Sequence, residues 1–174
     1  EGVASYTMPM GKVWVSGASY NLKYVATNQD YDLNVLDIGT TINVGNASVT
    51  AYFYSGSGIG QTSTNYLDNT AAGGGASATF DERDGDGGMI QATYVIPTGT
   101  KLGVAYGLNR WDLADGETSA SAVLDENNRW TVGAYHPLTK HLNLVAEFNA
   151  IESKDHQGDQ QESDSISLGA ILFF

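Results

Sequence analysis

Apolar and polar residues alternate with a period of two along most of this chain. Each alternating stretch runs for about ten residues and is bounded by Gly, Asn, Asp, Thr or Pro. Successive side chains of a β-strand point to opposite faces, so this pattern predicts strands with one apolar face and one polar face. No capping box precedes an apolar stripe of helical period. The pattern therefore predicts an all-β chain.

The last stretch shows the alternation most clearly. Apolar residues at every second position, from Ile166 to Phe174, form one face, while serines and Gly169 fill most of the other. Similar stretches recur upstream, and we count nine strands if residues 3–8 form the first. The other eight are predicted near residues 12–25, 36–43, 49–54, 90–96, 101–108, 129–134, 142–150 and 163–174.

The connections between these stretches alternate in length. Short turns are predicted at Pro9-Met10-Gly11, Gly45-Asn46, Thr98-Gly99 and Thr139-Lys140. Long polar segments are predicted at 26–30, 56–87, 113–127 and 154–162. Short turns at one rim and long loops at the other are typical of an outer-membrane β-barrel, with the turns periplasmic and the loops extracellular. A soluble β-sandwich has similar strands but lacks this regular alternation of connections.

The composition is acidic, with 8 Lys and Arg against 20 Asp and Glu and a formal net charge of −12. A nucleic-acid partner would need a basic surface, so none is expected. With no cysteine, neither a disulfide nor a thiolate metal site can form. The mean hydropathy of −0.22 is typical of soluble proteins. In a barrel, however, polar residues of the lumen dilute the apolar residues that face lipid.

Targeting and membrane-helix signals are missing from the sequence. No apolar run reaches the ~18 residues of a membrane helix. No charged segment followed by an apolar core marks a signal peptide. We expect the chain to be either already processed or a piece of a longer polypeptide.

Catalytic, metal and cofactor motifs find no support. Asp84-Gly85-Asp86-Gly87 lacks the further oxygen ligands of a calcium loop, so we expect a flexible acidic loop there. His136, His141 and His156 do not have the spacing of metal ligands. A nucleophile elbow and a phosphate-binding loop in its strand-to-helix context are also missing. We expect no enzyme activity, no metal and no cofactor.

The C-terminus carries a recognisable motif. A polar Ser167, then Gly169, then Leu172 and the terminal aromatic Phe174 form the assembly signal of outer-membrane barrels. A terminal strand with a free edge can be presented to the assembly machinery by strand addition. A plain edge strand that ends the chain is the alternative, and the regular alternation of turns and loops favours the signal.

Several hairpin segments resemble the late hairpins of gammaproteobacterial general diffusion porins. They are residues 87–94 with 100–107, and residues 129–135 with 138–148. The resemblance is clear from about residue 86 to the end and weaker before residue 50. It implies an integral outer-membrane protein, a homotrimer of sixteen-stranded barrels among lipid and lipopolysaccharide, and passive diffusion of small hydrophilic solutes and ions through water-filled pores.

An odd number of strands departs from the family, because bacterial single-chain barrels have even numbers. Residues 1–174 could be a single transmembrane domain, the last nine strands of a sixteen-stranded porin, incomplete at its N-terminal side. Alternatively, residues 1–10 are a periplasmic tail, and eight strands close a small barrel that acts as anchor, adhesin or receptor through its loops. Small inward residues suit a wide lumen and favour the porin, although some of them could instead make room for large neighbours such as Tyr52 or Tyr135. The small residues include Gly39, Gly103, Gly107, Gly133 and Gly169.

Charged residues on the polar face are candidates to line a pore. They are Lys101, Arg129, Glu147 and Asp37. Fixed charges along a pore tune ion selectivity. The alternative is a structural ion pair between neighbouring strands, for which Arg129 and Glu147 are placed.

Aromatic residues near strand ends are candidates for the girdles of a membrane barrel. They are Trp14, Trp111, Trp130 and Tyr106. Ordinary aromatics of a β-core are the alternative. Around residues 12–25 the alternation is less clear, and Trp14, Ala18, Tyr20 and Leu22 are placed on the apolar face.

Overall fold

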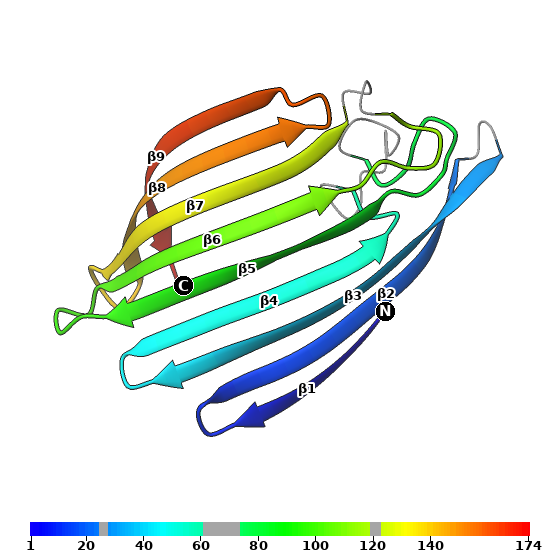
Figure 1. Cartoon of the computed structure of the whole chain (residues 1–174). Coiled ribbons are helices and arrows are strands. Elements are labelled where there is room, and N and C mark those ends of the chain that lie inside the picture. Colours follow the sequence, from blue (N-terminus) through cyan, green and yellow to red (C-terminus); the bar gives the residue numbers. More distant parts are fainter. Residues whose placement is uncertain (25–27, 61–73, 119–122) are drawn as a thin grey trace.

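The computed structural model describes residues 1–24, 28–60, 74–118 and 123–174. These residues form one antiparallel sheet of nine strands, each paired with its neighbour in sequence (Figure 1). Among them no helix is long or apolar enough to cross a membrane. The strands are β1 (Gly2–Met8), β2 (Gly11–Tyr24), β3 (Gln29–Val44), β4 (Ala47–Ser57), β5 (Asp84–Val95), β6 (Lys101–Trp111), β7 (Leu124–Pro137), β8 (Leu142–Asp155) and β9 (Gln160–Leu172).

The nine predicted strands and the four short turns are confirmed. The turns lie together at one end of the strands, called here the turn rim, and the long connections lie at the opposite end, the loop rim (Figure 1). The strands extend further toward the loop rim than the alternation predicts. The acidic segment from Asp84 to Gly87 was predicted to be a loop, and this prediction is wrong. The segment is the start of β5 and pairs with β4 and β6.

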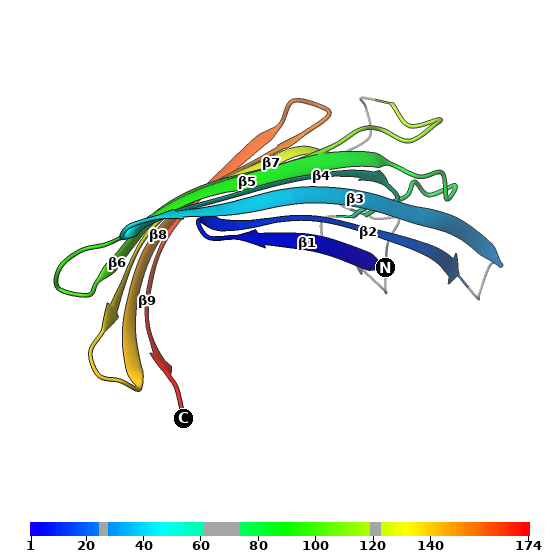
Figure 2. The same cartoon turned by 90° about the horizontal axis from the view of Figure 1, so that it is seen from below.

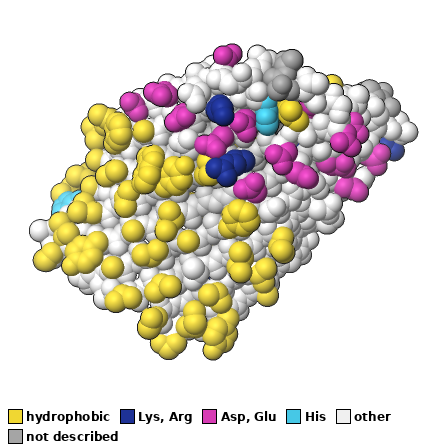
Figure 3. Space-filling model, viewed as in Figure 1, with side chains coloured by type: hydrophobic (Ala, Val, Ile, Leu, Met, Phe, Trp, Pro, Cys, Tyr) yellow, Lys and Arg dark blue, Asp and Glu magenta, His cyan; other side chains and the backbone are white. Residues whose placement is uncertain are grey.

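The sheet is strongly curved, so that it forms an open trough (Figure 2). Its convex face carries exposed apolar side chains, among them Leu36, Ile38, Val104, Val132 and Leu168. They gather over the strands, and charged side chains replace them near the loop rim (Figure 3). Polar and small side chains alternate with them and point to the concave face. One face of this sheet is therefore fit for lipid and the other for water.

The two edges of the sheet, β1 and β9, do not pair with each other. Residues 2–8 form a strand that pairs with β2 from Gly2 opposite Gly17 to Met8 opposite Gly11. The structure therefore does not have the periplasmic tail and closed eight-stranded barrel of the second alternative. It has the nine strands of the first.

The faces of β2 differ from the prediction. Trp14 lies opposite Gly39, and its indole nitrogen donates a hydrogen bond to Asp37 on the polar face, at 3.2 Å. Val13 and Val15 take the apolar positions instead and are exposed on the convex face. The prediction for Trp14, Ala18, Tyr20 and Leu22 is therefore wrong. The large aromatic rings of this strand obscured its apolar alternation, because they lie on the polar face.

Candidate functional site: the concave wall

The concave wall is defined here as the side chains of β2–β9 that point into the trough. Their register places residues of successive strands in straight rows across the sheet. One row runs from Trp14 through Gly39 and Tyr52 to Met89, Gly107 and Arg129. The next row toward the loop rim contains Ser16, Asp37, Tyr54, Gly87, Asn109 and Asn127. Polar groups thus alternate with aromatic rings and glycines over the wall.

All four charged residues proposed to line a pore lie on this wall. Asp37 is in β3, Lys101 in β6, Arg129 in β7 and Glu147 in β8. They are spread over the wall and do not form a cluster. Their charges are therefore located at separate positions along the trough.

The alternative reading of Arg129 and Glu147, a structural ion pair between neighbouring strands, is not found. Arg129 lies opposite Ile151, whereas Glu147 lies opposite Gly133, four residues along β7. The Arg129 guanidinium donates instead to Asn149 Oδ1, at 2.6 Å from Nη2. Asn149 is only 3% exposed, so this contact holds the Arg129 guanidinium against the wall.

Two aromatic rings lie across glycines of the wall. A Cβ at Gly39 would overlap the indole of Trp14, and one at Gly133 would crowd the ring of Tyr135. A Cβ at Gly87 would meet the Tyr54 hydroxyl and Asn109 Oδ1, which are joined by a hydrogen bond that the hydroxyl donates at 2.8 Å. These glycines make room for large neighbours. Gly103, Gly107 and Gly169 have no aromatic ring close to the position of a Cβ.

Each of these rings is held at its polar end. The Trp14 indole N–H bonds Asp37, whose other oxygen accepts a hydrogen bond from Ser16. The Tyr135 hydroxyl donates to Glu147. A ring that is packed on a glycine and fixed by a hydrogen bond keeps one face directed into the trough.

Two hollows lie side by side along the wall. The first, of about 550 Å³, lies between β2, β3, β4 and β6 and includes Trp14, Asp37 and Tyr54. The second, of about 390 Å³, extends toward β7 and includes Met89 and Arg129. Both are bordered by Tyr52 and Asn109. The first hollow has a negative group, and the second a positive one.

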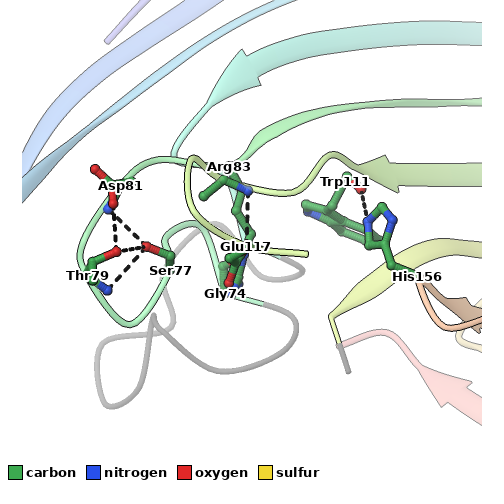
Figure 4. A network of polar contacts seen from close by, with 9 residues as sticks. Gly74, Ser77, Thr79, Asp81, Arg83, Trp111, Glu117 and His156 are labelled. Carbon is green, nitrogen blue, oxygen red and sulfur yellow. Dashed lines mark hydrogen bonds and ion pairs between the residues drawn. The ribbon is translucent and has the colours of Figure 1, made fainter. Parts of the chain in front are cut away.

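Several connections at the loop rim are joined by polar contacts, and together they are called here the loop body (Figure 4). It comprises residues 58–60 and 74–83 between β4 and β5, residues 112–118 after β6, and His156 after β8. Arg83 is at its centre, with a side chain only 2% exposed. Its guanidinium donates two bonds to Glu117, from Nε at 2.9 Å and from Nη2 at 2.6 Å, and a third to the Gly74 carbonyl at 2.9 Å.

The ion pair changes the proton affinity of Glu117. Hydrogen bonds from Arg83 lower the pKa of this carboxyl below its ordinary value, although burial opposes the shift. A bidentate contact of this kind also fixes the orientation of both side chains. Arg83 thus joins the β4–β5 connection to the β6–β7 connection.

Two further contacts attach the loop body to the strands. The Trp111 indole donates to the Ile59 carbonyl at 3.0 Å, and His156 Nε2 lies 2.8 Å from the Trp111 carbonyl oxygen. Ile59 and Gly60 border the first hollow, so the connection after β4 turns inward over the concave wall. Trp111 is only 3% exposed at the loop rim and does not lie in an outward girdle.

The other two predicted girdle residues lie together on the convex face. The rings of Tyr106 and Trp130 have their centroids 4.7 Å apart on neighbouring strands. Just beyond them toward the loop rim, Arg110 forms an exposed ion pair with Glu126 at 3.0 Å. The aromatic pair thus marks the border between the apolar and the charged part of this face.

The four residues of the predicted assembly signal lie in or just beyond β9. Ser167 and Gly169 face the trough, opposite Glu147 and Val145, whereas Leu172 lies opposite Leu142 on the convex face. Phe174 follows the strand at the turn rim and is fully exposed. Among the described residues, no group of acidic or histidine side chains could hold a metal ion.

We compared the structure with solved structures of other proteins. The structure resembles that of an outer-membrane channel, DcaP of Acinetobacter baumannii, with a TM-score of 0.77 and 16% sequence identity. The match covers 98% of this chain and 51% of that chain, so the present chain spans about half the length of the channel. The fold is that of part of a porin-like barrel. No protein-family model matches the chain, and no curated protein sequence matches it either.

The predicted fold class is therefore confirmed in its main features: an all-β, up-and-down antiparallel sheet that matches a fragment of a porin-like barrel. The alternation of residues could predict the wall. It could not predict the loop body, because Arg83, Glu117 and His156 are separated in sequence and belong to no periodic pattern. A lone arginine in an acidic loop is the only signal that Arg83 gives in the sequence.

Proposed function

We propose that this chain forms part of an outer-membrane porin in which the concave wall lines a water-filled pore for passive diffusion of small hydrophilic solutes and ions. The observation that carries the proposal is the opposite polarity of the two faces. Exposed apolar side chains cover the convex face, and all four charged candidates are on the concave face. A sheet with these two faces is suited to separate lipid from water.

The direction of the edge strands determines whether an odd or an even number of further strands can close the barrel. β1 and β9 both run from the loop rim to the turn rim, because nine is an odd number. An antiparallel barrel then needs an odd number of further strands between them. Seven would give the sixteen strands that the resemblance to general porins implies. We therefore propose that a preceding segment of the same polypeptide supplies them, and that residues 1–174 are one incomplete transmembrane domain.

The surroundings follow from the same arrangement. The turn rim would face the periplasm and the loop rim the exterior, where the acidic loops would meet lipopolysaccharide. The exposed β9 and Phe174 would be recognised by the assembly machinery through strand addition. A homotrimer, as in general porins, would cover part of the convex face.

Conductance of the full-length polypeptide in a planar lipid bilayer tests the proposal. We expect stepwise increases in current that grow with the conductivity of the salt solution. A well-folded protein that inserts without any current would contradict it. That result would favour the second candidate, an anchor or receptor that acts through its loops, for which the folded loop body is the specific observation.

A further inference from the structure

The first hollow of the concave wall has the composition of a binding site for an organic cation. Ten of the described residues line it, and Asp37 is the only charged one among these. Three aromatic residues line the same hollow as the carboxylate, namely Trp14, Tyr52 and Tyr54. Aromatic faces attract cations through their quadrupole, and the attraction grows when the site is partly removed from water.

The carboxylate has no cationic partner in the part of the chain that the structure describes. The ion pairs found there join Arg83 to Glu117, Arg110 to Glu126 and Lys154 to Asp125. Asp37 is half-buried, and among the described residues its side chain accepts hydrogen bonds from the neutral groups of Trp14 and Ser16. Its negative charge is therefore uncompensated by neighbouring side chains.

The aromatic surface is held in place before any ligand arrives. The Trp14 indole rests on Gly39, where a Cβ would overlap it, and its nitrogen is tied to Asp37. Tyr54 is fixed through its hydroxyl bond to Asn109. Little side-chain freedom remains to be lost on binding, which favours affinity.

We propose that this hollow binds a small organic cation with an ammonium group, which would approach Asp37 while its alkyl substituents contact the faces of Trp14 and Tyr52. The inference deepens the proposed function, because it rests on the concave wall being accessible to solutes from the pore. Organic cations would then be a class of solute that binds to the wall while it crosses the pore. A neutral sugar would also stack on aromatic rings, and the test distinguishes this alternative ligand from an organic cation.

Binding of choline to the folded full-length protein in detergent micelles tests this inference. The trimethylammonium signal would be followed by ligand-observed NMR. The matched probe is the neutral carbon isostere of choline, in which a tert-butyl group replaces trimethylammonium. We expect choline to bind about tenfold more tightly than the isostere. Equal binding of the two probes, or tighter binding of glucose than of choline, would overturn the proposal.

Variants locate the site. Asp37→Asn preserves the shape and can still accept a hydrogen bond from Trp14, so we expect it to weaken choline binding about tenfold and to leave the isostere unaffected. Trp14→Leu should weaken both probes. Glu147→Gln removes the same charge from another part of the wall and should change neither. If Glu147→Gln and Asp37→Asn weaken choline equally, the effect is only the general charge of the wall.

The test does not depend on conduction. If choline does not bind while the protein conducts, the binding site is wrong and the pore stands. If choline binds to a protein that does not conduct, the site stands and the proposed function is wrong. Should Asp37→Asn fail to fold, the comparison of choline with its isostere on the unaltered protein still decides between the outcomes.

Discussion

The turn rim and the loop rim of the sheet are stabilised by different interactions. At the turn rim, hairpins such as Gly45–Asn46 join neighbouring strands directly, and backbone hydrogen bonds close them. At the loop rim, residues far apart in sequence meet around the buried Arg83. The turn rim is thus built from contacts between residues close in sequence. In the described part of the loop rim, a buried ion pair joins two long connections.

Because of this difference, we expect the two rims to respond differently to substitutions. A local hairpin forms when its own residues allow the turn, so a change there has a limited effect. A buried ion pair fails as a unit, because the loss of one partner leaves the other charge buried without compensation. The loop body should therefore be the easier part of the molecule to disrupt without disturbing the strands.

The largest effect is expected from Arg83→Met. It leaves the Glu117 side chain, only 13% exposed, without its cation. We expect the loop body to lose about 3–5 kcal/mol of local stability. Hydrogen exchange should report the loss at the amides of Gly58 and His156, while the turn amide of Gly99 keeps its protection.

The matched control is Arg110→Met, which removes an exposed ion pair on the convex face. We expect no measurable change, because solvent screens such a pair. The double variant of Arg83→Met with Glu117→Leu should be less destabilised than Arg83→Met alone. Equal exchange in Arg83→Met and the unaltered protein would show that the ion pair does not hold the loop body.

A smaller effect is expected in the concave wall from Gly39→Ala. The new Cβ would overlap the Trp14 indole and displace it, at a cost of about 1–3 kcal/mol. Gly107→Ala places a Cβ on the same wall where the nearest atom is at 3.8 Å, so it should be neutral. Urea unfolding midpoints in detergent micelles compare the two. Equal midpoints would mean that the ring does not depend on Gly39.

At the turn rim, Gly45→Ala tests the local hairpin. Gly45 has a φ of 59°, a backbone conformation that costs other residues about 1–2 kcal/mol. The same urea titration should show a loss within this range, and exchange in the loop body should not change. Loss of protection at Gly58 or His156 in this variant would show that the two rims are coupled.

The smallest effect is a dependence on pH that is confined to the loop rim. The pKa of Glu117 is lowered in the folded protein, so its stabilising contribution is present above the ordinary value of 4.5. The contribution is lost as the pH falls below that value and through the lowered pKa. Protease cleavage at the loop rim, with an acid-active protease, should therefore increase at low pH. The Arg83→Met variant should lack this increase.

The sequence predicted the strands, the short turns and the positions of Asp37, Lys101, Arg129 and Glu147 on one face. It did so because a period of two has a single physical cause, the alternation of side chains in a strand. β2 was the exception, since Trp14 is large and apolar yet lies over Gly39 and bonds Asp37.

Contacts between residues distant in sequence could not be predicted in this way. Arg129 and Glu147, considered as an alternative ion pair, lie four residues apart in register, and no pattern within one strand determines that register. The contacts of Arg83 with Glu117 span two long connections. Such contacts depend on how the loops fold over the sheet, and alternation contains no information about that.

The central claim is that the concave wall faces the water of a pore, and cysteine labelling tests it most directly. Residues 1–174 contain no cysteine, so a single substitution introduces the only thiol of this part of the full-length polypeptide. Ala105 and Val104 are adjacent in β6 and point to the concave and convex faces. In a bilayer, a charged thiol reagent should react with Ala105→Cys and reduce the current, and should leave Val104→Cys unchanged. Reaction of both variants at equal rates, or of Val104→Cys alone, would contradict the account.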